Sequence, residues 1–125
     1  MKVKQHPVPG AAKQVVDLRR RLSPDPSKPI TQERFARFLG VSWSTVARWE
    51  TGGGHPDPHL AEKLVRLVQV LDVLGDMVVR EDRLLFFEQE HPLLLGLRPI
   101  DLLDNERGAR KVVELLEGAS SGAFA

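Results

Sequence analysis

Hydrophobic positions in residues 31–52 recur at the spacing of two short helices joined by a tight turn. Helical residues three and four apart lie on one face, so the apolar residues of each half can face a common core. Gly40 suits the left-handed residue that ends a helix, and the hydroxyls of Thr31 and Ser42 suit N-caps. The pattern predicts a helix-turn-helix whose inward residues are Phe35, Phe38 and Leu39 in its first helix and Val46 and Trp49 in its second.

The remaining apolar positions predict further helices. Helical spacing is seen over residues 11–22 and, as a longer leucine stripe, over residues 59–75. Shorter helices are expected at 81–91 and 99–103, and a last helix is expected to end at Gly118. No segment alternates with period two over more than a few residues, so the fold class is expected to be all-α.

Charge separates the two halves of the chain, although the net charge of the whole is only +1. Residues 1–55 hold ten basic and four acidic side chains, a net charge of +6, whereas residues 56–125 hold eight and thirteen, a net charge of −5. A positive half suits a phosphate backbone, and the acidic half suggests a different partner. Short domains also vary this much by chance. Residues 1–10 are expected to form a mobile basic arm.

Composition and spacing argue against several kinds of site. The sequence has no cysteine, and Pro56 and Pro58 interrupt any helix that would align His55 with His59, so no metal site or cofactor is expected. No nucleophile is visibly paired with a base, which argues against an enzyme. The sequence has no long apolar run and no signal peptide, which favours a cytoplasmic protein with no membrane partner.

Residues 31–52 resemble the Xre-type, lambda-repressor-like helix-turn-helix. The motif comprises Thr31-Gln32, Ala36, Gly40-Val41-Ser42, Val46, Trp49-Glu50 and Gly52. The resemblance implies binding to operator double-stranded DNA through the outward N-terminal face of the second helix. Trp43 stands where a polar residue is common and can pack on a sugar or a thymine methyl. The implied DNA-binding residues are Gln32, Ser42, Trp43, Ser44, Thr45 and Arg48.

Residues 91–125 resemble the C-terminal toxin-binding domain of the Xre/MbcA/ParS antitoxins. The matching positions are Pro92, Gly96, the run RPIDLL at 98–103, Gly108-Ala109 and the closing GAFA at 122–125. The resemblance implies the antitoxin of a type II toxin–antitoxin pair, whose usual partner is a RES-domain toxin that consumes NAD. In that family the C-terminal end obstructs the toxin's cleft and the helix-turn-helix represses the shared operon. The implied toxin-binding residues are Arg98, Ser120, Ser121, Gly122, Ala123, Phe124 and Ala125.

The expected organisation is a basic arm at 1–10, a helix-turn-helix bundle at 11–75 and a small helical toxin-binding domain at 76–125. A stand-alone dimeric regulator, whose C-terminal domain only dimerises or binds another protein, is the alternative. A repressor reads two half-sites, so a homodimer is expected. The leucine stripe serves either as core or as dimer interface, and we expect the interface at Leu60, Leu64, Leu67, Leu71 and Leu74, assisted by residues 84–87.

Overall fold

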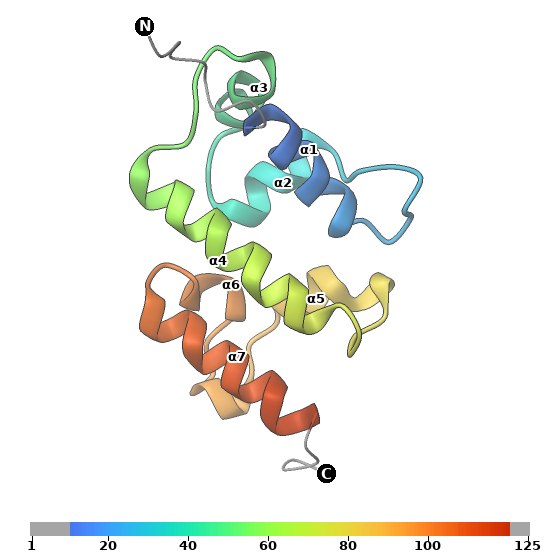
Figure 1. Cartoon of the computed structure of the whole chain (residues 1–125), viewed down its shortest axis with the longest axis vertical. Coiled ribbons are helices and arrows are strands. Elements are labelled where there is room, and N and C mark those ends of the chain that lie inside the picture. Colours follow the sequence, from blue (N-terminus) through green and yellow to red (C-terminus); the bar gives the residue numbers. More distant parts are fainter. Residues whose placement is uncertain (1–10, 121–125) are drawn as a thin grey trace, which may run out of the picture. The chain divides into compact units, whose positions relative to one another are not determined.

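The computed structural model describes residues 11–120, and the regular elements among them are all helical (Figure 1). The all-α fold class is therefore confirmed. Within residues 11–120, no helix has the length and apolar character needed to cross a bilayer. The elements are α1 (Ala11–Arg21), α2 (Gln32–Leu39), α3 (Trp43–Thr51), α4 (Pro58–Leu74), η1 (Arg80–Asp82), α5 (Arg83–Glu88), η2 (Pro92–Leu94), α6 (Pro99–Leu102) and α7 (Glu106–Ser120).

The chain divides into two compact units between Asp57 and Pro58. The first unit contains α1 to α3, and the second contains α4 to α7. This division differs from the one expected after residue 75. The reason is that α4 packs against α7 and so contributes its apolar face to the second unit.

In the first unit, the predicted caps of the helix-turn-helix are confirmed. The Thr31 hydroxyl accepts the backbone N–H of Arg34 at 3.0 Å, and the Ser42 hydroxyl accepts that of Thr45 at 3.2 Å. Gly40 ends α2 with a φ of 78°, a left-handed conformation that glycine adopts without a Cβ clash. The residues predicted to face inward are all buried: Phe35, Phe38, Leu39, Val46 and Trp49.

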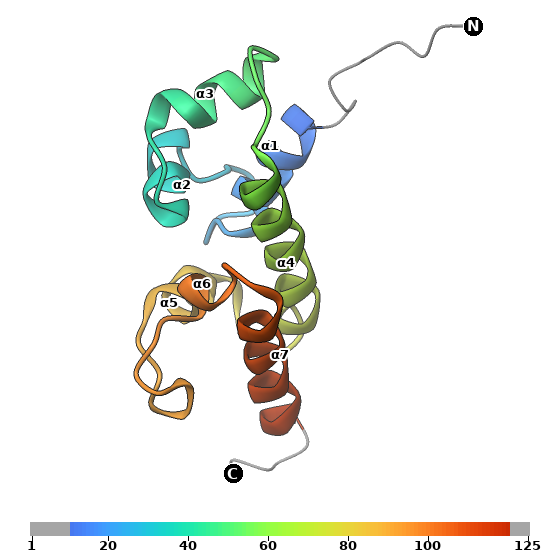
Figure 2. The same cartoon turned by 90° about the vertical axis from the view of Figure 1, so that its left-hand side faces the viewer.

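The second unit is built around α4 and α7, which lie side by side (Figures 1 and 2). Gly108 allows α7 to approach the chain after α6, because a Cβ placed there would lie 2.1 Å from the carbonyl oxygen of Leu102. The buried Lys63 ammonium on α4 binds the Asp104 carboxylate at 2.7 Å and so holds the same turn. The prediction that α7 ends at Gly118 was wrong. The helix continues through Ser120, since Ala119 and Ser120 can both extend it.

The predicted dimer interface on the α4 leucine stripe requires correction. Leu64, Leu67, Leu71 and Leu74 are buried within the single chain, and Leu60 is half-buried. Side chains that are already buried cannot also cover a second copy without unfolding the unit. The core interpretation therefore accounts for the stripe. In the assisting segment 84–87, Phe87 is likewise fully buried, whereas the Leu85 side chain is 56% exposed.

Candidate nucleic-acid and protein interfaces

Hydrogen bonds between side chains connect the three helices of the first unit. Arg19 Nη1 donates to both carboxylate oxygens of Glu50 at 2.7 and 2.8 Å, and Arg19 Nε donates to the Ile30 carbonyl at 2.7 Å. Glu50 also accepts Gln32 Nε2 at 3.0 Å. The Oε1 atom of Gln32 in turn accepts the indole N–H of Trp43 at 3.2 Å. This network fixes the first turn of α3 beside the first turn of α2.

The ion pair at the centre of this network is largely withdrawn from water. The side chains of Arg19 and Glu50 are only 12% and 11% exposed. Burying an ion is costly unless hydrogen bonds and an opposite charge replace its contacts with water. Here the Glu50 carboxylate supplies the opposite charge, and the Ile30 carbonyl accepts a further hydrogen bond from Arg19. Arg19 therefore orients the helices, and its guanidinium is committed to Glu50 and to the Ile30 carbonyl.

The N-terminal half of α3 presents an exposed edge. The Trp43 side chain is 58% exposed, and Ser44 and Arg48 are also exposed. Backbone N–H groups in the first turn of a helix favour an anion such as a phosphate. These three side chains can reach a ligand, and their contact with DNA stays a prediction.

The other predicted DNA-binding residues have structural partners in this edge. Ser42 caps α3, and its hydroxyl lies 2.7 Å from the Thr45 hydroxyl and 3.1 Å from that of Ser44. Gln32 is half-buried between Trp43 and Glu50. We infer that Gln32, Ser42 and Thr45 hold the N-terminal half of α3 in position. Their contact with DNA stays a prediction.

In the second unit, residues 92–97 form a rigid turn that we name the leucine loop. The His91 N–H donates to the Leu97 carbonyl at 3.1 Å, and the Gly96 N–H donates to the His91 carbonyl at 2.9 Å. The Leu93 N–H donates to His91 Nδ1 at 3.2 Å. Leu95 has a φ of 59° and its side chain is 89% exposed. The turn therefore holds three large apolar side chains in water: Leu93, Leu95 and Leu97.

The leucine loop borders an apolar hollow of about 390 Å³. Its other walls are Leu102 and, from α7, Lys111, Glu114 and Leu115. Sequence reasoning missed this site. The available signal was the run of leucines between Pro92 and Arg98, because a segment that short cannot bury every one of them.

The predicted toxin-binding residues begin just after the leucine loop. Arg98 is exposed and precedes α6, where its guanidinium makes two hydrogen bonds, at 2.8 and 2.9 Å, to the Asp101 carboxylate. Hydrogen bonding to Asp101 raises the pKa of Arg98 above its ordinary value. Ser120 is the last residue of α7. Residues Ser121, Gly122, Ala123, Phe124 and Ala125 lie outside the described residues.

Residues 11–120 contain no group of three or more His, Cys, Asp or Glu side chains that could hold an ion.

Comparison with known proteins identifies relatives of both units. Residues 29–71 match the helix-turn-helix family model. The mycobacterial cidal antitoxin MbcA of Mycobacterium tuberculosis and of Mycobacterium bovis is 27% identical over 96 residues, which is 76% of this chain and 83% of the relative. The resemblance to the Xre/MbcA-type antitoxins is thereby confirmed.

The fold is also similar to a solved structure. The crystal structure of the M. tuberculosis MbcT–MbcA toxin–antitoxin complex contains a chain that matches with a TM-score of 0.68 at 24% identity. The match covers 91% of this chain and 96% of the other. At this identity, the likeness establishes a shared fold.

Proposed function

We propose that this chain is an antitoxin with two binding units. The second unit and the C-terminal tail bind and neutralise a RES-domain toxin that consumes NAD, and the first unit binds operator DNA and represses the operon. The chain acts as a homodimer in the cytoplasm. The observation that carries the proposal is the leucine loop, and the likeness to MbcA supports it.

The leucine loop has the properties of a protein-binding surface. Clustered apolar side chains in water mark interaction sites, and here the cluster adjoins a hollow. The backbone hydrogen bonds of the turn hold these side chains in place before binding, which lowers the ordering cost of association. A partner that covers this loop gains the burial of the area still exposed in the free chain, which is 56% of Leu93, 89% of Leu95 and 48% of Leu97.

The tail is proposed to complete the contact with the toxin. Its sequence, SGAFA, combines small side chains with a single aromatic ring. Small residues permit close backbone approach within a narrow cleft, and one buried ring supplies most of the local contact area. Arg98 adds an exposed guanidinium close to the leucine loop in sequence.

A double substitution in the leucine loop tests the toxin-binding role. We expect Leu93→Ala with Leu95→Ala to weaken binding to the product of the adjacent gene at least about tenfold, since two buried leucines are each worth more than 1 kcal/mol. Binding is measured by calorimetry, and neutralisation by protection of NAD in a consumption assay. A second variant lacking residues 121–125 is expected to bind but to protect NAD poorly.

The matched control for the leucine loop is Val79→Ala, which truncates another exposed apolar side chain of the second unit. Unchanged affinity in the double variant would reject the leucine loop as the toxin contact. Failure of the unmodified chain to bind the product of the adjacent gene would favour the stand-alone regulator.

Arg48→Ala tests base reading by α3. A guanidinium that pairs with guanine contributes about 1–3 kcal/mol, so we expect weaker binding to DNA from upstream of the chain's own gene by that amount. Fluorescence anisotropy at one fixed salt concentration measures the loss. Lys13→Ala removes an exposed charge from α1 and serves as the control. Equal losses in the two variants would show that Arg48 contributes only general charge.

A further inference from the structure

The indole ring of Trp43 is exposed at the first turn of α3, although its polar group is already bonded within the chain. Trp43 is 58% exposed, and its Nε1–H donates to the Oε1 atom of Gln32 at 3.2 Å. The Nε1–H is the only hydrogen-bonding group of an indole, and it can only donate. What the ring offers to a ligand is therefore its carbon surface.

The Gln32 side chain that holds the ring is itself fixed in one orientation. Gln32 Nε2 donates to the Glu50 carboxylate at 3.0 Å, and a carboxylate can only accept. Since the indole needs an acceptor and Glu50 needs a donor, one orientation of the amide satisfies both neighbours. Glu50 is held in turn by two hydrogen bonds from Arg19, and both side chains are largely buried. The exposed ring is thus tied to a buried ion pair before any ligand binds.

The same bonds turn the Gln32 amide away from a base. A glutamine that reads adenine directs its oxygen and its nitrogen together at the N6 and N7 atoms of the base. Here the oxygen of Gln32 faces Trp43 and its nitrogen faces Glu50, and the side chain is half-buried. Gln32 therefore acts as a positioning residue for the ring.

We propose that Trp43 determines operator specificity by reading the C5-methyl group of a thymine, and that Gln32 positions its ring for this contact. The thymine methyl is the apolar group that base edges present in the major groove. It matches the exposed carbon surface of the ring, whereas a polar base edge would lose water there without gaining a hydrogen bond. The inference deepens the proposed operator binding and rests on it.

Replacing thymine with uracil tests the methyl contact, because uracil pairs in the same way and lacks the methyl group. The probe is DNA from upstream of the chain's own gene, prepared once with thymine and once with uracil. The unmodified chain is expected to bind the uracil DNA at least about threefold more weakly, as burial of one methyl group predicts. Trp43→Ala is expected to bind the two DNAs equally. Fluorescence anisotropy at one fixed salt concentration measures the dissociation constants.

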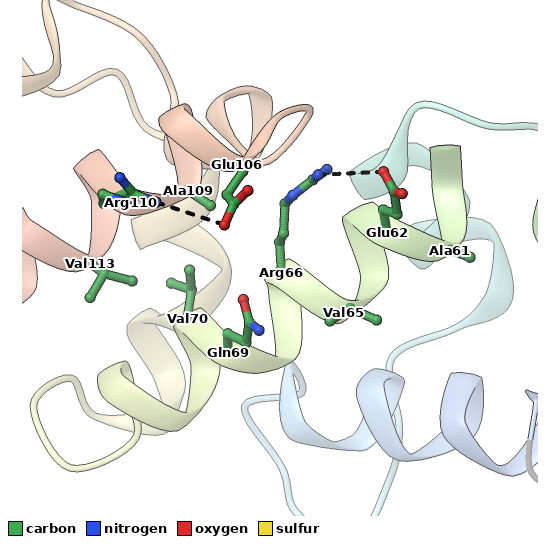
Figure 3. A pocket seen from close by; sticks show the side chains of 10 residues that line it. All are labelled: Ala61, Glu62, Val65, Arg66, Gln69, Val70, Glu106, Ala109, Arg110 and Val113. Carbon is green, nitrogen blue, oxygen red and sulfur yellow. Dashed lines mark hydrogen bonds and ion pairs between the residues drawn. The ribbon is translucent and has the colours of Figure 1, made fainter. Parts of the chain in front are cut away.

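The ratio of the two dissociation constants also tests the positioning role of Gln32. Gln32→Ala is expected to bring this ratio close to one, because the ring loses its anchor. The matched control is Gln69→Ala, which removes the same kind of side chain from a groove between α4 and α7 of the second unit (Figure 3). Gln69 is exposed, so we expect its removal to leave the ratio unchanged. Arg48→Ala is expected to weaken binding to both DNAs and to keep the ratio, which separates lost affinity from lost methyl reading.

Equal affinity of the unmodified chain for thymine and uracil DNA would overturn the proposal. A Trp43→Ala variant that binds both DNAs more weakly but still prefers thymine would place the ring on a sugar, and would overturn it too. Circular dichroism checks that each variant is folded. Failure of the unmodified chain to bind either DNA is a distinct outcome, which would reject the proposed repressor function together with this inference.

Discussion

Replacing Glu50 with alanine is expected to destabilise the first unit by about 3 kcal/mol and to abolish DNA binding, while toxin binding by the second unit persists. Glu50 accepts hydrogen bonds from Arg19 and from Gln32, and the Arg19 side chain is 12% exposed. Removal of the carboxylate leaves the Arg19 guanidinium buried without its counter-charge. The penalty is that of an uncompensated ion, which exceeds the worth of a surface ion pair several-fold.

Tryptophan fluorescence during denaturant unfolding measures this effect selectively. The sequence contains two tryptophans, Trp43 and Trp49, and both lie on α3. Glu33→Ala, which removes an exposed carboxylate from α2 of the same unit, is expected to cost only a few tenths of a kcal/mol. A loss below about 1 kcal/mol in Glu50→Ala would contradict a structural role for the ion pair.

Gly108→Ala is expected to destabilise the second unit by about 3 kcal/mol or more, at the upper end of the range for overpacking. The added Cβ would lie 2.1 Å from the Leu102 carbonyl oxygen and 2.9 Å from its carbonyl carbon. Those atoms belong to the backbone, so no side-chain rotation relieves the contact. Either α7 moves away from α6 or the turn between them rearranges.

Helical circular dichroism on heating detects this loss, and tryptophan fluorescence is expected to stay unchanged because the second unit contains no tryptophan. Gly54→Ala is the control, since a Cβ at Gly54 meets no atom within 4 Å. A Gly108→Ala variant with unaltered stability would mean that α7 and α6 are not held at this close approach.

The helix-turn-helix was predictable because its determinants are local. A cap needs one hydroxyl and an N–H three residues later, and a helix end needs one glycine with positive φ. The cap hydroxyls belong to Thr31 and Ser42. Gly40 can adopt a positive φ because it has no side chain. The order of helices along the chain followed from similarly short-range periodicity.

Features that depend on distant partners could not be read from spacing. Arg19 and Glu50 are 31 residues apart, and the sequence around either residue does not indicate that they form an ion pair. The leucine stripe of α4 identified an apolar face correctly, but periodicity does not say whether α7 or a second copy covers it. The Gly108–Leu102 contact likewise needed the packing of α6 on α7, although the glycine itself belonged to the motif that resembles the antitoxin family.

Leu95 combines two properties that work against folding. Its backbone is in the left-handed region, where glycine is less strained than leucine by about 1 kcal/mol, and its apolar side chain remains in water. Glycine at this position would avoid both the backbone strain and the exposed apolar side chain. Under the proposed toxin-binding role, a leucine at such a position trades stability of the free chain for affinity, and the leucine loop is then where the sequence departs from its own folding optimum.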